Sequence, residues 1–244
     1  MIKLAKMPNG EPEIFYTLQG EGVSSGQPAT FVRLTTCNLH CSWCDTPYTW
    51  NWEGTRWQTV SGHKFKREEV TIEMSPSQIY DWICRYPCKR LIITGGEPLL
   101  QQSALTTLLD LLPPEWTVEV ETNGTIVPDL LPSVEQLQFN VSLKLPHSGN
   151  APSIALKPDR IRWFVAHPQS YFKFVVAGEE DVAVIRELQA DYGIPADRII
   201  LMPEGTSSAK LHATLPVVAE LCILYGFRLS DRLHVHIWGD ERAK

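Results

Sequence analysis

The sequence predicts an α/β fold built on an open, partial barrel of about six parallel strands with reduced helices. Short apolar runs rich in β-branched and aromatic residues alternate with segments of helical periodicity, the pattern of parallel βα units. The strand runs are residues 30–37, 90–96, 116–124, 137–144, 171–178 and 198–203, and residues 233–239 are a candidate seventh, terminal strand. The stretch from Pro146 to Ser170 is polar, proline-rich and has little helical pattern. The count therefore falls short of a closed eight-stranded barrel of the TIM type.

Helical segments with their own start and stop signals lie between these strands. They are residues 75–86, 103–112, 179–193 and 209–226. Ser75 is predicted as an N-cap, with Pro76 in the first helical position and Gln78 completing a capping box. Gly193 is a plausible C-cap, and Pro216 predicts a kink or restart in the last helix.

Composition indicates a single domain that spans residues 1–244. The chain has 244 residues, 43% of them hydrophobic, which suffices for one sizeable core. A net charge of -6 and the lack of a long basic run make nucleic acid a weak candidate partner. We expect no membrane helix and no secretory signal, and therefore a cytoplasmic location. In that compartment, clustered cysteines favour metal or redox chemistry over disulfides.

The chemistry-bearing residues fall where the predicted strands end. In folds built from parallel strands, ligands gather at the carboxyl ends of the strands. Six residues occupy such ends: Cys37, Gly95, Gly96, Asn123, Lys144 and Pro203. We therefore expect one site made from motifs that are far apart in the sequence.

An aromatic insertion of about residues 48–67 follows the cysteines. It is long, rich in turn residues and carries Trp50, Trp52 and Trp57. Two interpretations stay open: a lid over the site, or a surface excursion held down by tryptophan burial.

Three closely spaced cysteines, Cys37, Cys41 and Cys44, form a C-x3-C-x2-C run after the first parallel strand. Structural zinc and the usual four-iron cluster each need four protein ligands, so three thiols leave one position open. On an iron-sulfur cluster, the open iron can bind and reduce another molecule. The alternative is zinc with a distant fourth ligand such as His40 or Cys88.

The cysteine run resembles the cluster-binding motif of the radical S-adenosylmethionine (SAM) enzymes, in which an aromatic residue, here Trp43, precedes the last cysteine. The sequence ITGGEP at 93–98 is similar to the GGEP motif of the same superfamily, and ETNGT at 121–125 follows in the familiar order. Within the superfamily, TLQGEG at 17–22 resembles the signature of the 7-carboxy-7-deazaguanine synthases. The sequences FVR at 31–33, CDT at 44–46 and HVHIWG at 234–239 strengthen that resemblance.

The resemblance implies an enzyme of the queuosine (deazapurine) pathway. Its members convert 6-carboxy-5,6,7,8-tetrahydropterin to 7-carboxy-7-deazaguanine by a radical ring contraction with loss of ammonia. The implied cofactors are a [4Fe-4S] cluster, SAM used catalytically, and Mg2+. Flavodoxin or ferredoxin is the implied electron donor, and a homodimer is the implied assembly.

The resemblance also implies a role for particular residues. Cys37, Cys41 and Cys44 would hold the cluster, and Thr46 would bind Mg2+. The implied SAM contacts are Trp43, Asp45, Gly96, Glu97, Ser142, Leu143, Lys144, Met202, Pro203, Glu204 and Gly205. The implied substrate contacts are Leu18, Gln19, Gly20, Arg33, Thr94 and His236.

Simpler roles stay open for three of these residues. Thr46 could cap a short turn, since Pro47 follows it. Arg33 could pair with Glu119 or Glu121 inside the fold, and His236 could be a structural histidine. One departure from the family pattern lies at 142–144, where Ser-Leu-Lys replaces Ser-Pro-Lys.

Three rival functions are weaker. A glycyl-radical activase would not be expected to carry TLQGEG, and a zinc-stabilised binding module would bind zinc rather than iron and sulfide. A redox-sensing regulator would show a DNA-binding helix pair or a basic stripe, and the sequence shows neither.

Overall fold

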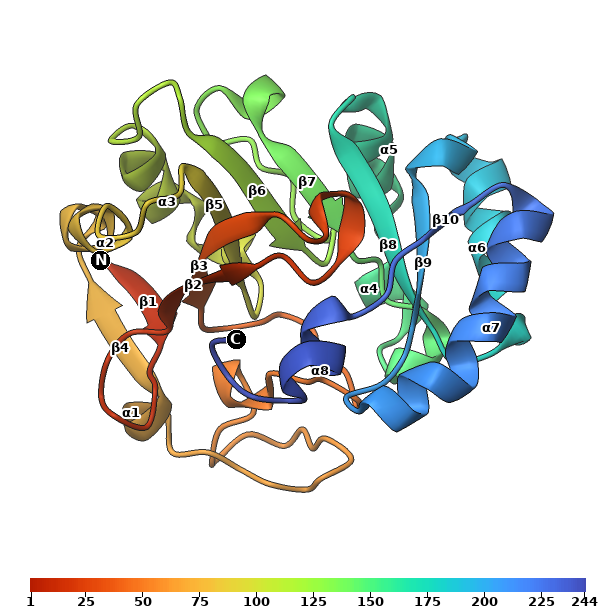
Figure 1. Ribbon diagram of the computed structural model, residues 1–244, viewed down its shortest axis with the longest axis horizontal. Coiled ribbons are helices and arrows are strands. Elements are labelled where there is room, and N and C mark those ends of the chain that lie inside the picture. Colours follow the sequence, from red (N-terminus) through yellow and green to blue (C-terminus); the bar gives the residue numbers. More distant parts are fainter.

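A curved, mainly parallel sheet forms the centre of the fold (Figure 1). The computed structural model describes residues 1–244. Seven strands run parallel in the order β10-β9-β8-β7-β6-β5-β3. Their bounds are β3 Pro28–Leu34, β5 Arg90–Gly95, β6 Thr117–Thr122, β7 Gln138–Val141, β8 Ser170–Val176, β9 Ile199–Pro203 and β10 Arg228–Leu229. The six predicted parallel strands are confirmed, and the two-residue β10 was not predicted.

Three antiparallel strands extend the sheet at its β3 end, and none of them was predicted. They are β1 Ile2–Ala5, β2 Ile14–Leu18 and β4 Thr71–Met74. β1 pairs with β3 and with β4, while β2 pairs with β3 along its length. This pairing places the end of β2, and the TLQGEG residues with it, beside the strand that leads into the cysteines.

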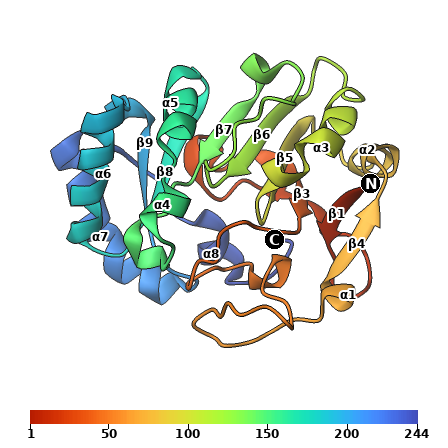
Figure 2. The same cartoon turned by 180° about the vertical axis from the view of Figure 1, so that it is seen from behind.

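The larger helices cover the outer face of the sheet (Figures 1 and 2). The helices are α1 Arg67–Val70, α2 Pro76–Ile83, α3 Gln102–Leu109, α4 Pro152–Ala155, α5 Pro158–Ala166, α6 Glu179–Tyr192, α7 Ser208–Tyr225 and α8 Leu233–Trp238. The capping box between Ser75 and Gln78 is present, and Gly193 and Gly226 cap their helices with left-handed backbone. None of the helices is long and apolar enough to cross a bilayer.

Two predictions were wrong at the level of single elements. Residues 158–166, which showed little helical pattern, form α5, because Ile161 and Phe164 pack into the core while Asp159, Arg160 and Arg162 are exposed. Residues 233–238 form α8 rather than a terminal strand. The position beside β9 is occupied by β10, and residues 233–238 pair with no strand. Pro216 lies inside α7, which continues across it as one helix.

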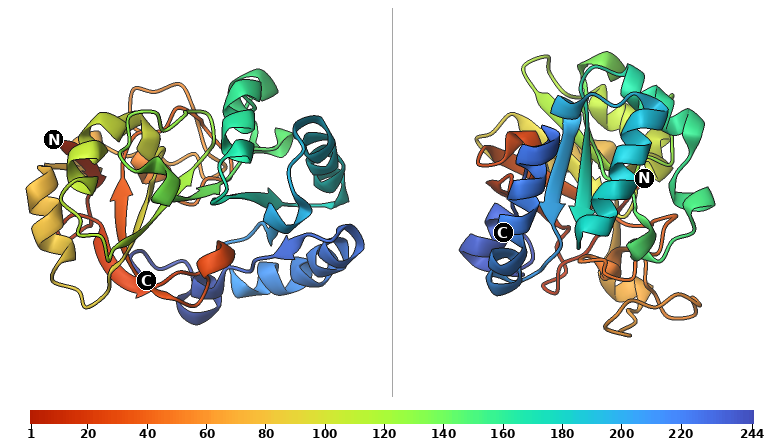
Figure 3. Two further views of the ribbon diagram at one scale, coloured as in Figure 1. Left: turned by 90° about the horizontal axis from the view of Figure 1, so that it is seen from above. Right: turned by 90° about the vertical axis from the view of Figure 1, so that its right-hand side faces the viewer.

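The sheet curves into an open arc, and α8 lies between the two ends of that arc (Figure 3). On one side, the Leu233 amide donates to the carbonyl of Gly20, 2.9 Å away, in the loop after β2. On the other side, the Arg232 guanidinium donates to the carbonyl of Gly205, 2.6 Å away, in the loop after β9. The C-terminal segment therefore bridges a gap that a closed barrel would fill with strands.

Phe139→Ala should lower the free energy of unfolding by about 3–5 kcal/mol. Phe139 on β7 is fully buried, and its ring meets Trp163 and Phe164 of α5 edge to face. Truncation would leave a cavity between sheet and helix. Chemical denaturation measures the loss, and Leu224→Ala on exposed α7 surface is the control, expected to change it by less than about 0.5 kcal/mol. Equal effects of the two changes would contradict this packing.

Candidate active site

A cavity of about 530 Å3 lies at the carboxyl ends of the parallel strands. The three cysteines line it, together with the ends of β2, β3, β5, β6, β7, β8 and β9 and residues 239–244. The expected convergence of distant motifs is therefore seen in the fold: Cys37, Gly95, Gly96, Asn123 and Lys144 all line this one cavity.

The three thiols sit in a shell of N–H donors. The Trp50 indole N–H lies 3.3 Å from Cys44 Sγ, and the Asn150 amide lies 3.3 Å from Cys41 Sγ. Cys37 Sγ accepts from the Leu39 backbone amide at 3.4 Å. Hydrogen bonds of this kind stabilise a thiolate and are one means by which proteins tune metal-bound sulfur.

Burial disfavours the charged form of all three thiols. It raises the pKa of Cys37 to about 12 and that of Cys44 to about 11, and it also raises the pKa of Cys41. The thiolates needed for ligation therefore form together with a bound Lewis acid, and binding releases protons.

The glycine pair of the GGEP turn lets β5 approach the cysteine loop closely. A Cβ on Gly95 would lie 2.0 Å from the Leu34 carbonyl oxygen, and one on Gly96 would lie 2.2 Å from the Thr36 carbonyl oxygen. Gly95 also has φ 137°, a conformation that glycine alone adopts readily. The amides of Gly96 and Glu97 donate to Leu34 and Thr36, which continues the ladder into the loop before Cys37.

Glu97 was expected to contact SAM, and its side chain does not reach the cavity. Its side chain is fully buried behind the cavity wall. One oxygen accepts from the Leu99 amide and the Thr122 hydroxyl, and the other accepts from the Asn123 amide at 2.7 Å. Burial raises the pKa of Glu97. The carboxylate thus joins the ends of β5 and β6, because a buried acid must satisfy its oxygens within the protein.

The remaining predicted SAM contacts divide into two groups. Six line the cavity: Trp43, Asp45, Gly96, Ser142, Lys144 and Met202. Four do not: Leu143, Pro203, Glu204 and Gly205. Leu143 points into the core, and Glu204 pairs with Lys210 at 2.7 Å. The alternation of extended backbone explains why Ser142 and Lys144 face the cavity while Leu143 does not.

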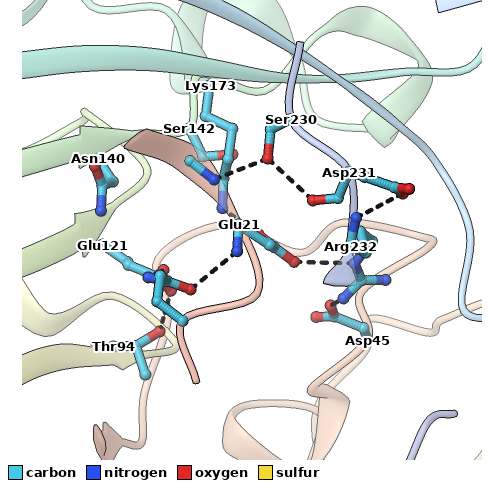
Figure 4. A network of polar contacts seen from close by, with 12 residues as sticks. Glu21, Asp45, Thr94, Glu121, Asn140, Ser142, Lys173, Ser230, Asp231 and Arg232 are labelled. Carbon is cyan, nitrogen blue, oxygen red and sulfur yellow. Dashed lines mark hydrogen bonds and ion pairs between the residues drawn. The ribbon is translucent and has the colours of Figure 1, made fainter. Parts of the chain in front are cut away.

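The predicted substrate contacts near β2, β3 and β5 come together. Leu18, Gln19, Gly20, Arg33 and Thr94 all line the cavity. Gln19 and Thr94 both donate to the carboxylate of Glu121, at 3.2 and 2.7 Å (Figure 4 shows Thr94 and Glu121). Glu121 has no cation within ion-pair distance. The hydrogen bonds from Gln19 and Thr94 hold its carboxylate at the cavity wall.

His236 lies outside the cavity, and His234 lines it. His236 Nε2 lies 2.9 Å from Asp231 Oδ2, and its ring meets that of His212 edge to face. His234 packs on Gly20, where a Cβ would lie 2.1 Å from His234 Nδ1. Both histidines would face the same side of a strand, but on a helix they point about 200° apart, so only His234 faces the cavity.

Thr46 lines the cavity, and its hydroxyl makes no capping hydrogen bond. It precedes the 3-10 turn Pro47–Thr49. Its Oγ1 lies 3.8 Å from Cys44 Sγ. The capping alternative for this residue is therefore wrong.

A network of charges crosses the cavity wall (Figure 4). Glu21, after β2, pairs with Lys173 of β8 and, at 2.9 Å, with Arg232. Arg232 also donates to Asp45 at 2.5 Å. Burial alone would raise the pKa of Glu21, but Lys173 and then Arg232 outweigh it and hold that pKa well below its usual range. The network ties TLQGEG, the cysteine loop and the segment before α8 to one another.

A second cluster centres on the buried carboxylate of Glu13. Arg33 Nε donates to it at 2.7 Å and the Tyr48 hydroxyl at 3.0 Å, and Arg242 also pairs with it. The two arginines lower the pKa of Glu13 against the effect of burial. Arg33 thus pairs with Glu13, not with Glu119 or Glu121, and its two terminal nitrogens make no hydrogen bond within the chain.

The aromatic insertion is partly cavity wall and partly surface. Tyr48, Trp50 and Phe65 line the cavity. The residues between them fold outward around Lys64, whose ammonium donates to Asn51 at 2.7 Å. Neither a simple lid nor a simple excursion describes this segment.

Known proteins share this sequence and fold. Residues 32–207 match the radical SAM superfamily. The chain is 33% identical over 235 residues to the 7-carboxy-7-deazaguanine synthase of Pyrobaculum aerophilum, covering 95% of this chain and 96% of that protein. The synthase of Halobacterium salinarum is 33% identical over 245 residues, 93% of this chain and 90% of that protein. The chain belongs to the 7-carboxy-7-deazaguanine synthase family of radical SAM enzymes. The crystal structure of QueE from Escherichia coli matches with TM-score 0.67 and 26% identity, over 96% of this chain and 94% of that one.

Membership in the radical SAM superfamily implies a [4Fe-4S] cluster and SAM, and the residues present fit this pair. Three thiols with N–H donors, Cys41 buried and Cys37 and Cys44 half-buried, face a cavity that has room beside them. No three His, Cys, Asp or Glu side chains converge to hold a single metal ion. A cluster needs no such convergence, since each thiolate binds its own iron. Of the two distant zinc ligands considered, Cys88 lies at the far end of β3, 3.1 Å from the Pro28 carbonyl, and His40 stacks on Trp57.

Sequence reasoning missed several residues of this synthase-family site. Glu21, Glu121 and His234 lie within the motifs TLQGEG, ETNGT and HVHIWG. The sequence therefore did contain a signal for these three residues. Lys173 interrupts an apolar strand, which is a weaker signal of a buried partner. Glu13, Arg232 and Arg242 carry no local signal, because their partners are far away in the sequence.

Arg232→Gln should lower the free energy of unfolding by about 3–5 kcal/mol, since it leaves Asp45 without its ion-pair partner and Glu21 with one cation instead of two. Urea denaturation measures the change. Arg232→Lys should recover only part of it, because one ammonium cannot reach Glu21, Asp45 and Gly205 as the guanidinium fork does. The exposed pair Arg162 and Asp159 supplies a control, Arg162→Gln, expected to cost less than about 1 kcal/mol. A fully stable Arg232→Gln protein would contradict the bridging role.

Proposed function

We propose that this chain converts 6-carboxy-5,6,7,8-tetrahydropterin to 7-carboxy-7-deazaguanine, with loss of ammonia, with SAM used catalytically and with Mg2+ bound. The observation that carries the proposal is the distribution of unpaired charge around the cavity that holds the cysteines. Glu121 presents a carboxylate without a cation partner, and Arg33 and Arg242 present two cations to the single carboxylate of Glu13.

This charge distribution complements a carboxypterin. The pyrimidine ring of a pterin carries N–H donors on one edge, which match a carboxylate such as Glu121. The carboxyl group lies at the opposite end of the molecule, where a guanidinium fork is the best partner. Four other charges of the cavity are paired among themselves: Glu21 and Asp45 with Lys173 and Arg232.

A bound cluster and SAM would supply a 5′-deoxyadenosyl radical able to abstract hydrogen from carbon 6 of the pterin. The protein orients the substrate and excludes water and side reactions. Gln19 and Thr94 would hold Glu121 for the ring, while Glu13, which also accepts from the Tyr48 hydroxyl, would hold Arg33 for the carboxylate. Because each charged contact is itself held by a neighbour, little reorganisation is needed when substrate binds.

The free hydroxyl of Thr46 supports the Mg2+ part of the proposal. Mg2+ favours oxygen ligands and retains water and substrate oxygens in its shell, so one hydroxyl beside a bound carboxylate fits its needs. We further propose that flavodoxin or ferredoxin reduces the cluster and that the enzyme is a homodimer. Both follow from the family resemblance.

The decisive experiment is anaerobic incubation of the reconstituted protein with SAM, a reductant and carboxytetrahydropterin, with and without Mg2+. We expect 7-carboxy-7-deazaguanine by mass spectrometry, in higher yield with Mg2+. Cys41→Ala should lose the iron-sulfur absorbance and all turnover, while Cys84→Ala, an exposed cysteine outside the cavity, should keep both. SAM cleavage without deazaguanine product would reject the substrate and keep the superfamily chemistry. A brown, active Cys41→Ala protein would reject the cluster assignment.

The two histidines of α8 give a sharper test of the site. His234→Ala should raise KM for the pterin at least about tenfold, the effect of losing one good polar contact. His236→Ala should leave kcat/KM unchanged, because that ring lies outside the cavity against Asp231 and His212. Steady-state kinetics of the two variants measure the difference. The reverse order of effects would show that residues 233–238 do not have the helical orientation described above.

A further inference from the structure

We infer that Arg242 is a second ligand for the substrate carboxylate and acts beside Arg33. The inference deepens the proposed function and rests on it. It concerns the last six residues, which the sequence left without a role and which all line the cavity.

The segment that carries Arg242 is anchored on the cavity rather than hanging beside it. Gly239, with φ 70°, ends α8 and turns the chain back toward β2 and β3. Ala243 then packs against the cluster of Phe15, Phe31 and their neighbours. Figure 1 shows this end of the chain beside β3 and α8. The position of Arg242 is therefore held from both sides.

Side-chain contacts fix the orientation of the Arg242 guanidinium. Its carbon lies 3.7 Å above the centre of the Tyr48 ring, a close cation–π contact. Its Nη2 donates to the Lys6 carbonyl at 3.2 Å and pairs with Glu13. Its Nη1 makes no hydrogen bond within the chain, and its Nε is buried without a partner. Arg242 is therefore fixed in its orientation and keeps N–H donors that the protein itself does not use.

The charge around Glu13 shows what kind of ligand this is. Two guanidinium groups share one carboxylate, which leaves one positive charge unbalanced at this wall of the cavity. Tyr48 adds a neutral donor to the same carboxylate and no anion. Asp45, the other acid near Arg33, is engaged by Arg232. A bound carboxylate would balance the charge and accept from the free nitrogens of both arginines.

The test compares two stable aromatic pterins, 6-carboxypterin and pterin, which differ only in the carboxyl group. Their Kd values are measured by isothermal titration calorimetry on the anaerobic, reconstituted enzyme with SAM and Mg2+ present. Arg242→Gln should raise the Kd for 6-carboxypterin about 10- to 150-fold, the effect of losing a hydrogen bond to a charged group. It should leave the Kd for pterin unchanged. Arg242→Lys should give an intermediate value, because the charge remains and the fork is lost.

Arg162→Gln is the matched control. Arg162 also pairs with a carboxylate, Asp159 at 3.1 Å, and lies over a tyrosine ring, Tyr192 at 5.6 Å, but it is exposed and remote from the cavity. It should change neither Kd. An equal weakening of both pterins by Arg242→Gln would show a purely structural role and overturn the inference, as would no change in either. A wild-type protein that binds neither pterin would overturn the proposed function and the inference with it. Binding of 6-carboxypterin that Arg242→Gln leaves intact would overturn the inference alone.

Discussion

The ion pairs of Glu21 with Lys173 and Arg232 connect β2 to β8 and to the segment before α8 across the opening of the sheet. The rest of the site depends on this connection. A full barrel joins its first and last strands by backbone hydrogen bonds, and here those strands are absent. Glu21 crosses from β2 to β8, and Arg232 extends the connection to the cysteine loop and to the loop after β9. Buried ion pairs add little net stability but are costly to break, so this closure specifies geometry more than it adds free energy.

A second constraint fixes the cysteine loop against the sheet. Gly95 and Gly96 remove the Cβ atoms that would strike the backbone of Leu34 and Thr36, and the loop then joins the ladder of β5. Glu97 fixes the same corner from behind, through the backbone of Asn123. The GGEP motif therefore has a backbone role in this chain before any ligand arrives. The Glu97 side chain supports the site from behind and does not line the cavity.

The sequence was sufficient for the parallel strands because each is a short apolar run between turn signals. It was also sufficient for residues at strand ends, since parallel strands deliver them to one edge. It failed where the outcome depended on distant partners. β1, β2 and β4 are short strands whose pairing partners lie elsewhere in the fold, and α5 is held by the packing of Phe164 on Phe139. His236 was chosen over His234 because an alternating hexapeptide is ambiguous between a strand and one and a half turns of helix.

Charged residues around the cavity have two kinds of role. Some pair with one another and stabilise the cavity wall, and others are available to a ligand. Glu21, Lys173, Arg232 and Asp45 neutralise one another, and Glu97 is turned into the protein. Holding Arg33 and Arg242 on one buried carboxylate costs stability, since two cations in low dielectric repel each other. The cost is recovered only when a second carboxylate arrives. The charges of this site are balanced only when a ligand carboxylate is bound. A structural ion pair, in contrast, is balanced within the folded protein itself.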